Sequence, residues 1–299
     1  MNKKDFIESL NLLKVKGKGF FSDHDSSRFL VAFRKECFDR VQSYTPDSLA
    51  IIYEKVRNTK SAEELEIFRK IMILECLLNS WNDIFSDKYP PSIQIEFKKN
   101  SERMLKMCQN DTGWREYSDD DYWKDLAIAR QQMYPAGAGI VEIYSGFGLR
   151  QGLSLNLRQS FRFLKLLISS RGRRGYFQIH THTPLLCEFN EQGWNDCYMR
   201  ISEMLVRHED IKGVFRASWF CDPELAKTSP RLEYLQKMPV ENGAKIFYIQ
   251  ADQTGNPFVK SKTRLKLYKE GKYKPKTYLL VWPRKELIKW ARTSQEGHM

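Results

Sequence analysis

Residues 176–220 read YFQIHTHTPLLCEFNEQGWNDCYMRISEMLVRHEDIKGVFRASWF, and this stretch decides the fold class. Its aromatic and β-branched start predicts a strand over Tyr176–His182, and apolar residues at helical spacing predict a helix over Gly193–His208. A second apolar run predicts a strand over Val214–Phe220. A strand, a helix and a strand in succession are typical of an α/β layer.

The same alternation continues on both sides of this stretch. The sequence motif Tyr134–Gly139, which reads YPAGAG, predicts a domain boundary. The further elements that we expect are a strand over Ile140–Tyr144, a helix over Leu155–Ser169, a helix over Ser229–Met238, a strand over Lys245–Gln250, a helix over Val259–Lys269, a strand over Thr277–Trp282 and a helix over Arg284–Ala291. Residues 135–299 should therefore form an α/β domain with a mixed central sheet.

Residues 1–134 are predicted to form a mainly helical region that packs on the α/β domain. Helices are expected over 26–43, 46–57, 61–81 and Asp119–Met133, and the third of them opens with a capping-box pattern, Ser61 and Glu64. Two prolines in the segment Lys88–Ser92 should interrupt the helices. The alternation of apolar and polar residues over Ile93–Phe97 predicts a short edge strand.

Composition narrows the class of protein and its partners. The chain has 299 residues, of which 41% are hydrophobic, and its longest apolar runs are too short to span a bilayer. The basic N-terminal segment lacks the apolar core of a secretion signal, so we expect a cytoplasmic protein. A net charge of +12 favours anionic partners, although solvated lysines on an ordinary surface explain it too. Because no nucleic-acid-binding motif occurs, nucleic acid is the less favoured partner.

His180 and His182 form a candidate site in the predicted strand. Side chains two residues apart in a strand lie on the same face, so the two imidazoles could bind a metal with Glu188 nearby. The whole chain has five histidines, which is too few for the known histidine-rich metal patterns that begin in this way. We therefore favour a histidine pair beside a substrate cleft or in the core, and expect no metal.

A glycine-containing segment follows the predicted strand at 140–144. Residues 145–152 read SGFGLRQG, and the segment Val141–Gly148 resembles the first motif of S-adenosylmethionine-dependent methyltransferases. Glycines between a strand and a helix let the backbone approach a phosphate group. A plain turn explains the same glycines, and both interpretations stay open.

The start of the predicted helix at 193–208 is a third candidate. Residues 189–195 read FNEQGWN, in which Gln192, Gly193 and the amides that follow could form a seat for an anion. The alternative is a helix capped by Asn190 with Trp194 in the core.

The stretch 261–283, SKTRLKLYKEGKYKPKTYLLVWP, predicts a basic helix, a glycine that ends it and an aromatic strand. Tyr268 near the end of this helix is a candidate proton donor or an ordinary core residue. Together with Gly193, the positions Ser261, Arg264 and Tyr268 make the C-terminal domain resemble the GCN5-related N-acetyltransferase (GNAT) superfamily, in which a helix ending in a tyrosine leads to a closing strand.

The resemblance implies an acyl-CoA N-acyltransferase-like fold and transfer of an acyl group to an amine acceptor. The donor would be acyl-CoA as co-substrate, or an acyl carrier protein, bound through residues Gln192, Gly193 and Trp194. Tyr268 would protonate the leaving thiolate, with Glu188 or His182 as base. Two other functions stay open: a methyltransferase that uses 146–152 for its cofactor, and a non-catalytic basic adaptor that binds nucleic acid or acidic protein.

Overall fold

A computed structural model describes residues 2–18, 44–45, 47–110, 117–153, 156–252, 255–259 and 261–296. The helix expected over 26–43 lies outside these residues. The chain forms two compact units. The first consists of Met1–Ile143 with Thr181–Cys187, and the second of Tyr144–His180 with Glu188–Met299.

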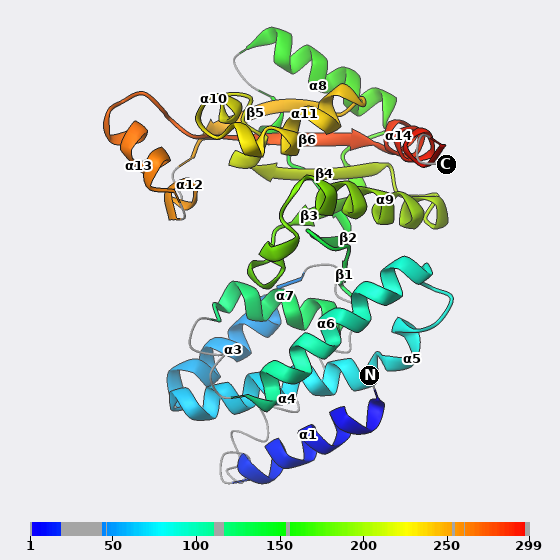
Figure 1. Ribbon diagram of the computed structural model, residues 1–299, viewed down its shortest axis with the longest axis vertical. Helices are drawn as coiled ribbons and strands as arrows, with labels where there is room; N and C mark the ends of the chain where they lie inside the picture. Colours follow the sequence, from blue (N-terminus) through cyan, green and yellow to red (C-terminus); the bar gives the residue numbers. More distant parts are fainter. Residues whose placement is uncertain are drawn as a thin grey trace. The chain divides into compact units, whose positions relative to one another are not determined.

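Helices build the first unit (Figure 1). They are α1 (Lys3–Lys16), α3 (Asp47–Thr59), α4 (Ala62–Asn79), α5 (Trp81–Ile84), α6 (Pro91–Gln109) and α7 (Asp119–Ala129). The helices predicted over 46–57 and 61–81 are confirmed, as is the capping box: Glu64 N–H donates to Ser61 Oγ, and Ser61 N–H donates to Glu64 Oε2. Helix α4 is apolar on most of its surface and is largely buried, so it supplies much of the core of this unit.

The strand predicted over Ile93–Phe97 is wrong. These residues lie in the first turns of α6, whose first residue is Pro91. A proline at the first helical position loses no hydrogen bond, so the proline pair ends one helix and starts the next. Ile93 and Phe97 are four residues apart and are both buried on one face of the helix. The helix predicted over Asp119–Met133 ends at Ala129.

Six strands form a mixed sheet in the order β1-β2-β3-β4-β6-β5, which confirms the predicted mixed α/β class. The strands are β1 (Met133–Pro135), β2 (Ile140–Gly146), β3 (Arg174–His180), β4 (Gly213–Ser218), β5 (Lys245–Ala251) and β6 (Lys276–Pro283). The β3–β4 pair is parallel, whereas β6 runs antiparallel to both β4 and β5.

The second unit contains helices on both faces of its strands (Figure 1). They are α8 (Leu157–Ser169), α9 (Glu191–Arg207), α10 (Leu225–Thr228), α11 (Tyr234–Glu241), α12 (Asn256–Val259), α13 (Lys262–Lys269) and α14 (Arg284–Glu296). These positions largely agree with the predicted alternation. The helix expected over Ser229–Met238 is a 3-10 turn, Pro230–Leu232, followed by α11, and the helix expected over Val259–Lys269 starts at Lys262. The short helices α10 and α12 were not predicted.

Alternating strand residues divide the second unit into two apolar layers. On one face Phe163 and Leu166 of α8 pack against Phe215 of β4 and Phe247 of β5. On the other face the rings of Tyr198 in α9 and Trp290 in α14 lie against the Trp282 ring of β6; the Tyr198–Trp282 and Trp282–Trp290 ring centroids are 5.1 and 5.3 Å apart. The two layers hold α8 on one side of the sheet and α9 with α14 on the other.

Candidate functional site

The carboxyl ends of β3 and β4 define the candidate site of the second unit. These parallel strands pair only at Phe177 with Val214 and at Gln178 with Phe215. On its other side β4 pairs with β6 along all of its length, from Gly213 to Ser218. The β3–β4 pairing therefore stops before the carboxyl ends of both strands. Open α/β sheets bind ligands at such ends, beside the start of the connecting helix.

Helix α9, which connects these two strands, starts in a tight turn. The Asn190 side chain caps the helix, since its Oδ1 accepts a 2.9 Å hydrogen bond from Gly193 N–H. A Cβ atom at residue 193 would overlap the backbone carbonyl of Glu188, so glycine is required there. The N–H groups of Glu191 and Gln192 form no hydrogen bond within the described structure and are directed out of the helix start. The Asn190 cap is therefore present, and it leaves these two N–H groups without a partner among the described residues.

Trp194 follows the cap and is buried. Its ring meets the Phe189 ring edge-on at 5.5 Å, and the Arg216 guanidinium of β4 lies 4.8 Å from its centroid. Gln192 is exposed and donates a 2.8 Å hydrogen bond to Asp196. Of the three predicted cofactor residues, Gly193 shapes the turn, Gln192 lies at the surface and Trp194 packs in the core beside a cation.

Arg216 is the residue that the sequence reasoning missed. Its side chain is 3% exposed and donates to the Leu235 backbone carbonyl, and no carboxylate among the described residues forms an ion pair with it. Four further polar atoms of this layer are buried without a hydrogen-bond partner: Arg216 Nε, Trp194 Nε1 and the hydroxyls of Tyr198 and Tyr234. Burial raises the pKa of Tyr234 to about 12, although the nearby Arg216 charge acts to lower it, so this phenol stays protonated.

A cavity of about 550 Å³ opens beside the first turns of α9. It is lined by Gln192, Asn195, Asp196 and Met199 of α9, Met238 of α11, and Trp290, Ser294 and Gln295 of α14. Its volume is in the range of small-molecule sites, and it combines an indole ring and thioethers with amide side chains. It lies entirely within the second unit.

Tyr268 lies on α13 with its side chain 49% exposed and its ring 4.7 Å from that of Phe258. Gly271 follows with φ +70°, a left-handed conformation that suits glycine at a helix end. No hydrogen bond, ion pair or ring contact links Tyr268 to Glu188 or to residues 192–194 in the described parts of the chain. Glu188 ends a 3-10 turn (Thr183–Glu188) and is half-buried.

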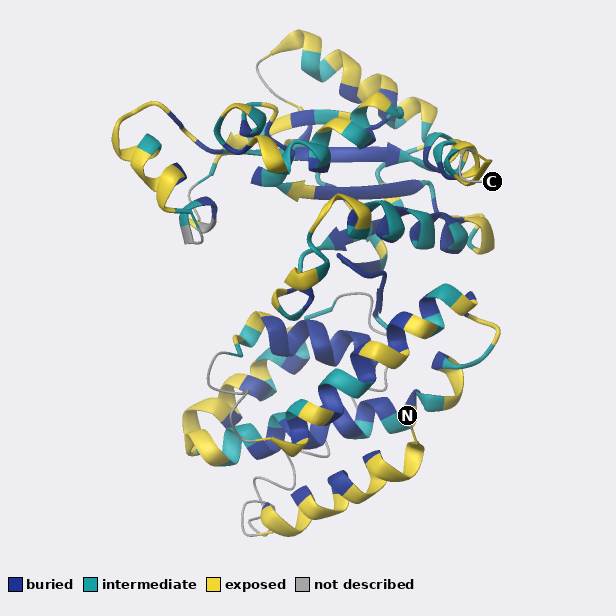
Figure 2. Ribbon diagram, in the orientation of Figure 1, coloured by how far each residue is buried: buried dark blue, intermediate teal, exposed yellow. Residues whose placement is uncertain are grey.

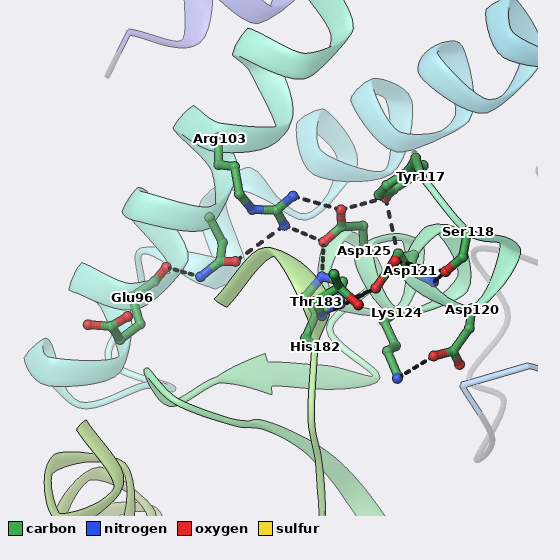
Figure 3. A network of polar contacts seen from close by, with 11 residues as sticks. Glu96, Arg103, Tyr117, Ser118, Asp120, Asp121, Lys124, Asp125, His182 and Thr183 are labelled. Atoms are coloured by element: carbon green, nitrogen blue, oxygen red, sulfur yellow. Dashed lines mark hydrogen bonds and ion pairs between the residues drawn. The ribbon is translucent and has the colours of Figure 1, made fainter. Parts of the chain in front are cut away.

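His182 has a different environment from the one expected. Strand β3 ends at His180, so the prediction that His180 and His182 share one face of the strand is wrong. His182 belongs to the first unit, where its buried ring lies between two carboxylates of α7 (Figure 3). Nε2 lies 2.9 Å from Asp125 Oδ1, and Nδ1 lies 3.2 Å from Asp121 Oδ1 in an ion pair without hydrogen-bond geometry.

Asp125 lies at the centre of this cluster, which Figure 3 shows from close by. Its carboxylate accepts two hydrogen bonds from the Arg103 guanidinium of α6 and one from the Tyr117 hydroxyl, in addition to the His182 contact. Asp121 accepts from Ser118 Oγ and from the Thr183 backbone N–H.

The pKa shifts in the cluster keep its members charged. Burial alone would lower the pKa of His182, but the Asp125 charge and the contacts with both carboxylates raise it above 6.5. Burial opposes ionisation of Asp121, yet the contacts with His182 and Ser118 hold its pKa at about 2. In Asp125 the Arg103 and His182 charges likewise outweigh burial and lower the pKa. Two cations and two anions balance, so we assign His182 to a closed ion cluster rather than to base catalysis.

The glycines of the segment 145–152 pack against protein atoms. A Cβ at Gly152 would overlap the Phe163 ring, and one at Gly146 would come within 2.8 Å of the Arg173 carbonyl oxygen. The Gly148 N–H donates to Gln151 Oε1 at 2.7 Å. Close packing accounts for Gly146 and Gly152, whereas a Cβ at Gly148 would lie 3.7 Å from its nearest neighbour, an ordinary contact distance.

Comparisons with known proteins give no relative. No family model, no curated protein and no solved structure matches the chain. Across the described ranges, no helix has the length and apolarity needed to cross a membrane. The described residues also contain no group of three or more His, Cys, Asp or Glu side chains arranged to hold a metal ion.

Proposed function

We propose that the second unit binds an acyl-coenzyme A and transfers its acyl group to an amine acceptor. The observation that carries this proposal is the short β3–β4 pairing, which leaves the carboxyl ends of these two parallel strands unpaired with each other next to the start of α9. A thioester donor needs an opening in the sheet for its chain and a helix start for its diphosphate, and these two features lie together here.

Helix α9 supplies the phosphate seat. The N–H groups of Glu191 and Gln192 remain for an anion after the Asn190 cap has used that of Gly193. The close approach of Gly193 to Glu188 keeps this turn compact. The positive end of the helix dipole and the buried Arg216 charge behind Trp194 both favour a diphosphate at this place.

The cavity next to Gln192 supports the same ligand. Its indole ring, thioethers and amides suit the adenine-containing end of coenzyme A, because a flat heterocycle stacks on Trp290 and hydrogen-bonds to amide side chains. The net charge of +12 adds a long-range attraction for a polyphosphate or for an acidic carrier protein.

The transfer step uses one base and one acid. Glu188 accepts a proton from the acceptor amine as its nitrogen attacks the thioester carbonyl, the carbon–sulfur bond breaks, and Tyr268 donates its hydroxyl proton to the leaving thiolate. Solvent then returns the proton from Glu188 to Tyr268. The exposure of Tyr268 leaves its hydroxyl accessible, whereas His182 has both ring nitrogens beside carboxylates.

Thermal unfolding with a panel of ligands tests the proposal. Coenzyme A, acetyl-coenzyme A and a long-chain acyl-coenzyme A are compared with S-adenosylmethionine. A bound donor at about 100 times its dissociation constant should add about 2.7 kcal/mol to stability. A response to S-adenosylmethionine alone, or to none of these ligands, would contradict the proposal.

Tyr268→Phe then tests the acid. In an assay of free thiol released with a set of amine acceptors, this variant should keep the donor-induced thermal shift and lose turnover by about 10²–10⁴-fold. Tyr248→Phe, which alters another exposed tyrosine of the second unit, is the matched control and should keep its turnover. Equal turnover in both variants would remove Tyr268 from the mechanism.

A further inference from the structure

Helix α8 exposes an apolar stripe to solvent. Phe163 and Leu166 face the sheet and are buried, whereas the opposite side carries Leu157, Phe161, Leu164 and Ile168, which are 84%, 71%, 47% and 80% exposed. Their spacings of four, three and four residues place them along one line of the helix. Figure 2 shows α8 as a largely exposed helix at the edge of the second unit.

The stripe is fixed in place by the rest of the unit. The Gln159 side chain donates to the Tyr248 carbonyl at 2.9 Å and accepts from the Tyr248 N–H at 3.0 Å, so α8 is attached to the edge strand β5. The two buried residues of α8 belong to the core of this face. The exposed stripe therefore belongs to a helix that is docked on the sheet.

The charges around the stripe have one sign. Between Glu142 and Glu188 the sequence contains no Asp or Glu and seven basic residues: Arg150, Arg158, Arg162, Lys165, Arg171, Arg173 and Arg174. Arg158, Arg162 and Lys165 each follow a stripe residue by one position, and all three are exposed. Arg158 and Lys165 thus lie along one border of the apolar line, whereas the Arg162 guanidinium lies on the sheet side, 5.9 Å from the centroid of the Phe247 ring.

We propose that α8 binds the surface of anionic lipid membranes, with Leu157, Phe161, Leu164 and Ile168 inserted at the boundary of the acyl chains and the basic residues at the headgroups. A helix with one apolar face and a Lys/Arg-rich border is the pattern that lies in the plane of a membrane interface. A second copy of the chain is disfavoured as the occupant, because two such faces would bring like charges together.

Sedimentation of the full chain with lipid vesicles tests this surface. Vesicles of phosphatidylcholine are compared with vesicles that contain roughly one third phosphatidylserine. We expect binding to the anionic vesicles only, and a fall in the bound fraction as salt rises. Absence of binding to anionic vesicles would overturn the proposal, and so would equal binding to both kinds.

Paired substitutions locate the binding. Phe161→Gln with Ile168→Gln should reduce vesicle binding by more than about tenfold, since it removes two inserted side chains. Arg158→Gln with Lys165→Gln should reduce it by about thirtyfold. The matched control is Leu12→Gln with Val15→Gln, which alters two residues of similar exposure on the basic helix α1 and should leave binding unchanged.

Two further results would overturn the assignment of α8. One is that the α1 variant loses vesicle binding while the α8 variants keep it. The other is a dimer, or binding of an acidic acyl carrier protein, that depends on Phe161 and Ile168 while vesicles do not bind. Circular dichroism of each variant shows whether it has kept its helix content. Because vesicle binding requires no acyl-coenzyme A, this outcome is independent of the proposed transferase activity.

Discussion

Arg103 in the first unit has a side chain that is 23% exposed, whereas Arg216 in the second unit is 3% exposed, and the partners of the two cations differ. Arg103 forms two hydrogen bonds with Asp125, which also contacts His182 and Tyr117. Arg216 donates to a backbone carbonyl and lies over an indole ring, and no described carboxylate pairs with it. The first cation is part of a balanced cluster, whereas the second adds uncompensated positive charge beside the start of α9.

This difference assigns different roles to the two units. A charge that is paired with opposite charges from neighbouring elements holds those elements together, and the cluster ties α6, α7 and the segment 181–187 into one unit. A buried cation without an anionic partner costs free energy that a nearby bound anion recovers. The comparison therefore directs ligand experiments to the second unit and stability experiments to the first.

The largest expected effect is that of Asp125→Asn. Asparagine keeps the shape of the side chain but leaves Arg103 and His182 without their shared anion. Removing one partner of a buried ion pair typically costs about 3–5 kcal/mol of the free energy of unfolding. This loss in the free energy of unfolding is measured by urea titration, with circular dichroism as the signal. Asp120→Asn, at an exposed carboxylate of α7 that pairs with Lys124, should cost less than about 1 kcal/mol. Equal losses in the two variants would show that Asp125 is not central to the cluster.

The pH dependence of stability follows from His182. Its pKa is raised in the folded state, so its contribution is complete below the unfolded pKa of about 6.5 and is lost as pH rises through the folded value. Around the ring, Asp121 and Asp125 favour the proton, Arg103 opposes it, and Tyr117 stays neutral because burial raises its pKa. The thermal stability of the wild type should therefore fall as the pH rises above about 6.5.

His182→Gln should be less stable than the wild type near pH 6 and should lose most of this pH dependence. His180→Gln, at the end of β3, is the matched control and should keep it. The Asp121 carboxyl, whose pKa is about 2, gives the opposite dependence of stability on pH. Its contribution to stability is present above about pH 4 and is lost as the pH falls toward 2. A wild type whose stability does not fall as the pH rises above about 6.5 would contradict a charged His182.

The sequence predicted most of the second unit because its strands and helices carry clear periodicities and its loops carry the expected glycines. It misassigned Ile93–Phe97, where alternation over five residues is too short to distinguish a strand from the first turns of a helix. It could not assign Thr181–Cys187 to the first unit, because the His182–Asp125 contact joins residues 57 positions apart. Only the placement of Asp121 and Asp125 on one face of α7 follows from their spacing of four.

The residues around the start of α9 were only partly foreseen from the sequence, for similar reasons. Gly193 was found because a glycine before a long amphipathic helix is a local signal. Arg216 was missed, although the run Val214–Ser218 carries a local signal for it. Arg216 shares the strand face of Val214, so a charged residue occurs where an apolar one is expected. Its neighbours Trp194 and Leu235 come from two other elements, and no local pattern brings these together.

The smallest expected effect on stability is that of Arg216→Met. Methionine keeps much of the side-chain volume against Trp194 and removes a cation that has no anionic partner, so the free energy of unfolding should change by less than about 1 kcal/mol or increase. Arg103→Met is the matched variant, and because it leaves Asp125 without its main cation, it should lose about 3–5 kcal/mol. The same Arg216 variant should also show a smaller thermal shift with coenzyme A than the wild type, since the positive charge behind α9 is gone. If Arg216→Met were as destabilising as Arg103→Met, the second cation would be as structural as the first, and the electrostatic argument for a diphosphate at α9 would rest on the helix start alone.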